Sequence, residues 1–147
     1  RGVSLQLLYA DEKFSVPENV YIIGMMNTAD RSLAMLDYAL RRRFAFFEFS
    51  PAFETDGFRQ YRQGKDNKKF DSLIATIEKL NTAIENDETL GRGFLIGHSY
   101  FCTDKPIDDM WLNAVVTYEI VPLLNEYWFD EPSKVRDWEY ALREAIR

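Results

Sequence analysis

The stretch Met25–Phe44, MMNTADRSLAMLDYALRRRF, determines the expected fold class of the chain. It overlaps the apolar run Val20–Met26, which does not alternate with polar residues and therefore predicts a strand buried on both faces of a parallel sheet. Ser32 is a suitable N-cap for a helix whose leucines recur at helical spacing. The aromatic segment Phe44–Phe49 then predicts a second strand. This strand–helix–strand order predicts an α/β unit.

On either side of this unit the pattern changes. Upstream, Val3–Tyr9 and Phe14–Val16 are the arms of a predicted hairpin. Downstream of Ser50, three segments carry apolar residues at the 3.6-residue helical period: Lys69–Asn86, Asp108–Trp128 and Ser133–Arg147. Pro122 is expected to kink the second of these helices, and Ser133 to cap the third. The sequence therefore predicts a mainly α-helical part after the α/β unit, with Phe53–Asn67 left unassigned.

Composition restricts the functional classes. The formal net charge of −6 argues against a principal DNA-gripping surface, because nonspecific affinity for DNA comes from Lys and Arg. Cys102 and His98 are the single cysteine and histidine, too few for a disulfide framework or a closed zinc site, so no metal site is predicted. No apolar run approaches the roughly 20 residues that span a bilayer. We expect a cytoplasmic protein, and the opening Arg1-Gly2 indicates a piece of a longer one.

Asn27 stands at the carboxyl end of the first predicted strand, where open α/β sheets bind ligands. Its amide is suited to orient a water molecule or to contact a terminal phosphate oxygen. Alternatively, Asn27-Thr28-Ala29-Asp30 is only a turn, because these residue types favour turns. The following helix ends in Arg41, Arg42 and Arg43. Because consecutive helical residues point about 100° apart, at most two of these cations can reach one ligand. The alternative is that the three arginines are a cationic run that complements the C-terminus of the helix.

A glycine-rich segment, Gly91–Phe101 (GRGFLIGHSYF), is the second candidate ligand-binding region. Glycines let a backbone approach a ligand closely, and Arg92, His98 and Ser99 add polar groups. The segment is not a P-loop, because no Gly-Lys-Ser/Thr ending occurs. A structural hydrogen-bonding role for the lone His98 stays open beside a ligand-binding one.

Three pieces of sequence carry a family resemblance: Met26–Ser32 (MNTADRS), Asp37–Phe44 (DYALRRRF) and Ile96–Phe101 (IGHSYF). Together they resemble the McrB family, the AAA+ GTPase subunit of methylation-dependent restriction systems. The resemblance covers most of the chain and is weakest in Phe53–Asn67. It implies an incomplete AAA+ α/β core over residues 1–50, made of a sensor-1 strand, a finger helix and the following strand. Residues 51–147 would be the α-helical lid.

The resemblance also implies site residues. Asn27 would be the sensor-1 residue, and Arg42 and Arg43 the arginine fingers that reach a neighbouring subunit's nucleotide. The further nucleotide-contacting residues that it implies are Thr28, Asp30, Arg31, Arg41, Arg92, Gly97, His98 and Ser99. For the intact protein it implies GTP and Mg²⁺, a homo-oligomeric ring, a McrC-type endonuclease partner and a separate DNA-binding domain.

The Walker A lysine and the Walker B acidic pair are absent from this sequence. Since these groups supply most of the charge stabilisation in phosphoryl transfer, we expect that the chain alone does not bind GTP tightly, so that no cofactor stays bound to it, and that it does not hydrolyse GTP. The two predicted strands also lack the strand that lies between them in AAA+ folds, so self-association or a reorganised α/β part is expected. Two other interpretations stay open: a protein-interaction module without a nucleotide role, and a part of an ATP-dependent AAA+ remodelling protein.

Overall fold

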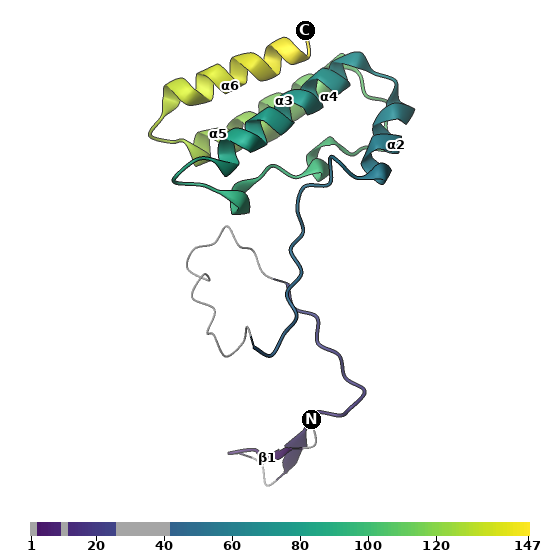
Figure 1. The fold of residues 1–147 in the computed structure, drawn as a ribbon, viewed down its shortest axis with the longest axis vertical. Helices are drawn as coiled ribbons and strands as arrows, with labels where there is room; N and C mark the ends of the chain where they lie inside the picture. The colour runs from purple at the N-terminus through teal and green to yellow at the C-terminus, as the bar shows by residue number, and fades with distance from the viewer. Residues whose placement is uncertain (1–2, 10–11, 26–41) are drawn as a thin grey trace.

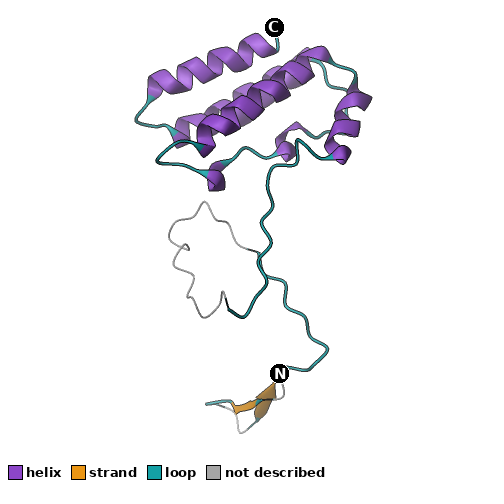
Figure 2. Cartoon of the chain, in the orientation of Figure 1, coloured by secondary structure: helices purple, strands orange, loops and turns teal. Residues whose placement is uncertain are grey.

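The structure, a computed structural model, describes residues 3–9, 12–25 and 42–147. Within these residues the fold is mainly helical, and strands are confined to one short hairpin (Figures 1 and 2). Strand β1 (Ser4–Gln6) pairs antiparallel with β2 (Lys13–Ser15), with Leu5 opposite Phe14. The predicted hairpin is thus confirmed, although its arms are shorter. A two-stranded hairpin is marginally stable on its own, since so few residues pair.

Helix α3 (Lys68–Glu85) is the centre of the helical part, and it confirms the helix predicted from the 3.6-residue period. The Asn67 side chain accepts a hydrogen bond from the backbone N–H of Phe70 and so caps the helix. The amide of Asn67 also donates to the carbonyl of Ile107, 2.9 Å away, which joins the start of α3 to the segment before the next helix. Before α3 lies α2 (Asp56–Lys65), within the segment Phe53–Asn67 that the sequence pattern left unassigned.

The second predicted helix forms a continuous rod of three parts: α4 (Asp109–Ala114), the π-helical segment η4 (Val115–Ile120) and α5 (Val121–Tyr127). The backbone N–H of Val121 bonds to the carbonyl of Val116, five residues back. Pro122 follows at once, and proline has no N–H and crowds the carbonyl four residues before it in a regular helix. The wider π turn accommodates this proline, so a change of helix type stands where the sequence predicts a kink.

Helix α6 (Pro132–Ala145) is the third predicted helix, and its cap differs from the prediction. Glu131 occupies the N-cap position, no side chain caps the helix, and Ser133 lies inside the first turn. The Ser133 cap was therefore wrong. Pro132 explains the difference, because its fixed φ suits the first helical position and its missing N–H needs no acceptor there.

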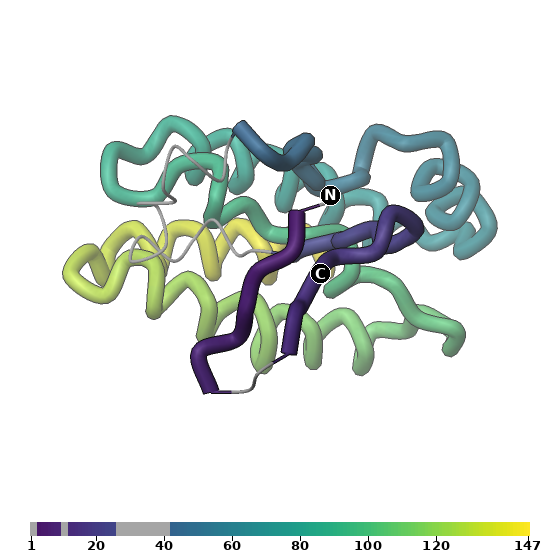
Figure 3. The backbone as a smooth tube through the Cα atoms, turned by 90° about the horizontal axis from the view of Figure 1, so that it is seen from below, coloured from purple at the N-terminus to yellow at the C-terminus, as the bar shows by residue number. Residues whose placement is uncertain are grey.

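The core lies between these helices. Helix α6 packs against α3 and against the η4–α5 part of the rod, and the three run alongside one another (Figures 1 and 3). Every buried apolar side chain among the described residues comes from Phe53 or later. Those that are fully enclosed include Phe70, Leu73, Ile74, Ile77, Leu80, Ile84, Leu112, Ile120, Leu124 and Leu142. The helical part thus has one core of its own.

The segments before Phe53 differ from the predicted α/β unit. The described residues of the predicted strands at Val20–Met26 and Phe44–Phe49 form no strand and are exposed, with Ile23 92% and Phe49 89% accessible. The two-strand prediction is therefore not met in this structure. The physical reason is that a strand bonds only to neighbouring strands, whereas a helix satisfies its backbone locally. The described strands β1 and β2 pair only with each other.

Candidate functional site

The two predicted halves of the site differ in what the structure describes. Asn27, Thr28, Asp30, Arg31 and Arg41 lie outside the described residues, so their assignment stays a prediction. Arg42 and Arg43 form an exposed turn that leads into the extended residues 45–50. The second half, Gly91–Phe101, is described in full and connects α3 to the α4–η4–α5 rod.

This connection contains two 3₁₀ turns, η2 (Arg92–Phe94) and η3 (His98–Phe101). Gly91 begins it with a φ of 81°, a conformation that residues with a Cβ adopt rarely, and its N–H bonds to the carbonyl of Ile84. Gly97 caps η3 in an extended conformation. The glycine-rich segment Gly91–Phe101 is thus irregular apart from these two turns, and backbone geometry requires glycine at Gly91.

Asn81 fixes the middle of this connection. It is the one buried polar residue among the described residues, and it projects from the apolar face of α3. Its side-chain oxygen accepts from the backbone N–H of Ile96 at 2.7 Å, and its amide donates to the carbonyl of Ile96 at 2.9 Å. Removing this amide would leave both backbone groups buried without partners, which is costly. Asn81 therefore holds η3 at a set position against α3.

Asp87 fixes the start of the connection. Its nearly buried carboxylate accepts from the ammonium of Lys134 at 2.6 Å, from the indole N–H of Trp128 at 2.9 Å and from the backbone N–H of Thr89 at 2.9 Å. The hydrogen bond from Lys134 is the main reason that the pKa of Asp87 lies well below its usual range. Burial acts to lower the pKa of Lys134, but the hydrogen bond and charge of Asp87 outweigh it and raise that pKa.

His98 has a structural role in this geometry. Its Nδ1 accepts a hydrogen bond from the backbone N–H of Ala52 at 3.1 Å, which assigns the neutral form with its proton on Nε2. The imidazole meets the rings of Phe53 and Phe58 edge-on, with centroids 6.3 and 5.9 Å away. The structural alternative for His98 is thus the one that these contacts favour.

Tyr61 and Lys65 of α2 fix the far side of η3. The hydroxyl of Tyr61 accepts from the backbone N–H of Thr103 at 2.8 Å and lies 3.2 Å from the carbonyl of Phe101. The ammonium of Lys65 donates to the carbonyl of Thr103 at 2.6 Å. Together with Asn81, these contacts hold η3 from both ends.

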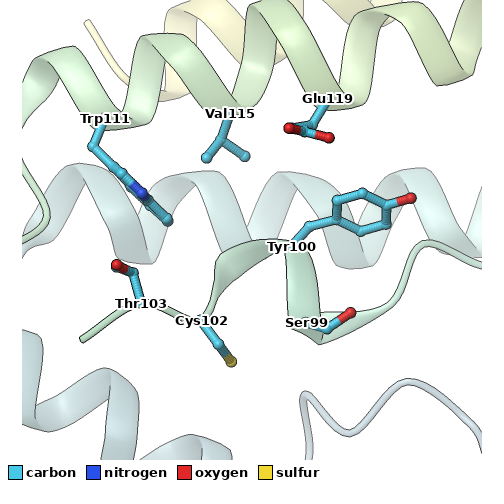
Figure 4. Close-up of a pocket in the computed structure, with 7 residues that line it drawn as sticks. All are labelled: Ser99, Tyr100, Cys102, Thr103, Trp111, Val115 and Glu119. Carbon is cyan, nitrogen blue, oxygen red and sulfur yellow. The ribbon is translucent and has the colours of Figure 1, made fainter. Parts of the chain in front are cut away.

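A cavity of about 380 Å³ opens between η3 and the α4–η4 rod (Figure 4). Figure 4 shows side chains from the rod on one side and from η3 and its continuation on the other. The lining residues are Ser99, Tyr100, Cys102, Thr103, Trp111, Val115 and Glu119. Burial raises the pKa of the Cys102 thiol, so it is mostly protonated at neutral pH.

The structure brings together only some of the predicted residues. Gly97, His98 and Ser99 are consecutive in η3 and its cap, and of these Ser99 lines the cavity. Arg92 does not line it, and its guanidinium pairs with Glu85 at 3.1 Å. No group of three or more His, Cys, Asp or Glu side chains able to hold a metal ion occurs in the described ranges.

Sequence reasoning missed Asn81, Tyr61, Trp111 and Glu119. Asn81 gave a signal, since it is a polar residue within the apolar face of a predicted helix. Trp111 and Glu119 lie eight residues apart, a spacing that places them on one helical face. Nothing local in the sequence indicates that η3 faces them.

No helix in the described part of the chain has the length and apolar character that crossing a bilayer requires.

Comparison with known proteins identifies the helical part. Residues 72–136, which span α3, η2, η3, the rod and the start of α6, match the family described as "McrB, alpha-helical lid domain". These residues form a lid domain of that type.

The chain is also 49% identical, over 149 aligned residues, to the "Type IV methyl-directed restriction enzyme EcoKMcrB subunit" of Escherichia coli (strain K12). The alignment covers 95% of this chain and 32% of that subunit. The chain therefore belongs to the McrB family and spans about a third of this relative's length.

Proposed function

We propose that the chain is the part of a McrB-type AAA+ motor that senses the γ-phosphate and covers the nucleotide. In this proposal the motor hydrolyses GTP with Mg²⁺ in a homo-oligomeric ring, recruits a McrC-type endonuclease and restricts methylated DNA that a separate domain recognises. The observation that carries it is the 49% identity over 95% of the chain, which includes both the lid and the segment with the NTADR sequence.

Asn27 is the proposed sensor-1 residue, and Arg42 and Arg43 are the proposed fingers. The exposed position of Arg42 and Arg43 supports this role, because a finger must reach a nucleotide held by another subunit. A finger arginine stabilises the charge that develops on the phosphate oxygens and accelerates hydrolysis by about 10³–10⁵. Thr28, Asp30, Arg31 and Arg41 are proposed to complete this half of the site.

The lid is proposed to contact the nucleotide through η3. The polar contacts of Asn81 and Tyr61 support this role, because a binding turn is more effective when its backbone is held in place before the ligand arrives. His98 contributes by joining η3 to the backbone at Ala52, where the lid meets the preceding segment.

A chimera tests the arginines. This chain replaces the matching segment of the E. coli subunit, and GTP turnover is measured for the parent chimera and for Arg42→Ala, Arg43→Ala and Asn27→Ala. We expect the finger variant to lose about 10³-fold or more in turnover. Arg59→Ala is the matched control, because Arg59 is an exposed lid arginine paired only with nearby acidic side chains. A chimera that keeps full turnover without Arg42 and Arg43 contradicts the proposal.

The purified 147-residue chain provides a second test. We expect no GTP hydrolysis by the chain alone, because the phosphate-binding lysine and the metal-binding acidic pair are not in its sequence. Turnover above the buffer rate, lost on Asn27→Ala, would show that the chain is a complete catalyst and would contradict this part of the proposal.

A further inference from the structure

We propose that the cavity between η3 and the α4–η4 rod binds the nucleotide base, and that Glu119 selects a base with two adjacent N–H donors. This inference rests on the proposed function, because it extends the nucleotide site that η3 would face. It adds the walls of a base pocket, Trp111 and Tyr100, and one specificity-determining residue, Glu119. Tyr100 lies in the segment Gly91–Phe101 that the sequence indicated, whereas Trp111 and Glu119 were not among the predicted site residues.

The first argument is the arrangement of the rod. Trp111, Val115 and Glu119 follow one another at intervals of four residues, and their side chains line the cavity from one face of the rod (Figure 4). Val115 and Glu119 belong to the π-helical segment η4. Such segments are frequent at functional sites, because the wider turn shifts the direction of the side chains relative to the helix before it.

The second argument is the shape and lining of the cavity. It is open to solvent, with Tyr100, Cys102 and Glu119 exposed, and its volume of about 380 Å³ is large enough for a purine ring system. The indole of Trp111 offers a flat surface for stacking, an interaction that any nucleobase can make. The ring of Phe70 contacts Trp111 edge-to-face, with the ring centroids 6.3 Å apart at an angle of 67°.

The third argument is the charge at the end of the cavity. The carboxylate of Glu119 is directed toward the space between the rod and η3 (Figure 4). None of the ion pairs among the described residues involves Glu119. An ionised carboxylate only accepts hydrogen bonds, and its two oxygens suit two parallel donors.

This chemistry distinguishes between purines. Guanine presents a ring N–H and an amino group side by side on its pairing edge, so both oxygens of Glu119 would accept a hydrogen bond. Adenine presents an amino group beside an unprotonated ring nitrogen, which would face a carboxylate oxygen and repel it. The pocket is therefore expected to favour guanine.

Cys102 can report whether the cavity is occupied. Cys102 lines the same cavity, and it is the single cysteine of the sequence. The test uses the purified 147-residue chain with GMP and AMP at millimolar concentration, and it measures the rate at which N-ethylmaleimide alkylates Cys102. The indole N–H signal of Trp111 in a ¹H–¹⁵N spectrum reports binding independently. Monophosphates serve as probes because the base is the part of the ligand under test.

We expect GMP to slow alkylation and shift the Trp111 signal at about tenfold lower concentration than AMP, a discrimination typical of one bidentate contact. Glu119→Gln should weaken GMP about tenfold and remove the preference, because an amide offers one donor and one acceptor. Glu126→Gln is the matched control, since Glu126 is an exposed carboxylate of α5 outside this cavity. It should leave both ligands unchanged.

Equal effects of GMP and AMP on the wild-type chain would overturn the role of Glu119, and no protection of Cys102 by either would overturn the base pocket. These failures are separate from failure of the proposed function. A chimera that loses turnover on removal of Arg42 and Arg43, with no protection of Cys102 by GMP, refutes the pocket alone. Protection by GMP with arginine-independent turnover refutes the finger assignment alone.

Discussion

The segments before Phe53 and the helical part after it are both rich in large apolar side chains, yet only the second forms a core. Phe70 is fully buried, whereas Phe47 is 80% exposed. The reason is that an amphipathic helix satisfies its own backbone and needs only a neighbour to pack against. A buried strand needs hydrogen-bonding strands on its edges as well, and the described residues supply none for Val20–Met25 or Phe44–Phe49.

The largest expected effect compares two phenylalanines across this boundary. Phe70→Ala should lower the free energy of unfolding by about 3–5 kcal/mol, because it leaves a cavity between the rings of Tyr61 and Trp111. Phe47→Ala should change it by less than about 0.5 kcal/mol. Urea unfolding followed by circular dichroism measures both. Equal effects would show that the segment containing Phe47 packs into the same core as Phe70.

Asn81 tests whether η3 is held by α3. Asn81→Ala should cost about 2–3 kcal/mol in unfolding free energy, because both the N–H and the carbonyl of Ile96 lose their partner in a buried place. Asn113→Ala removes an exposed amide that bonds only to the helix turn before it, and should cost under about 0.5 kcal/mol. If the two variants had the same free energy of unfolding, Asn81 would not be what holds η3 against α3.

Asp87 makes the stability of the helical part depend on pH. The folded-state pKa of Asp87 is depressed, so its contribution to stability is fully present above its ordinary pKa of about 3.9. The contribution decreases progressively as pH falls from that value through the lower folded-state pKa. Asp87→Asn should cost about 2 kcal/mol at pH 7, as for other hydrogen bonds to charged groups, and less at pH 3, where the carboxyl is already mostly protonated in the unfolded state. Asp130→Asn changes an exposed carboxylate nearby and serves as the control.

Unfolding midpoints of wild type and variant across pH 3–7 measure this difference. A gap between wild type and Asp87→Asn that stays constant down to pH 3 would contradict the ionised pair with Lys134. Tyr127 titrates far outside this window, since burial raises its pKa to about 12.

The smallest effect concerns the hydroxyl of Tyr61. Tyr61→Phe should cost about 1 kcal/mol, because the backbone N–H of Thr103 loses its acceptor while the ring keeps its packing. It should also speed amide exchange at Thr103. Tyr118→Phe removes an exposed hydroxyl and should be neutral. An unchanged exchange rate at Thr103 would show that α2 does not restrain η3.

The sequence predicted the helices well and the site only in part. The apolar positions of α3 recur at 3.6 residues, so its existence followed from local pattern. The failure to form strands at Val20–Met25 did not follow, because strand formation depends on partners distant in sequence. The role of His98 as acceptor for Ala52, 46 residues away, and the closeness of η3 to Trp111 are tertiary facts without a local signal.

In this structure the lid folds on its own core, whereas residues 20–25 and 44–49 have no strand partner among the described residues. Native-state amide hydrogen exchange on the full chain tests this difference. We predict strong protection in α3, the rod and α6, and exchange at nearly the unprotected rate in residues 20–25 and 44–49. Strong protection in residues 20–25 and 44–49, comparable to that of α3, would contradict it.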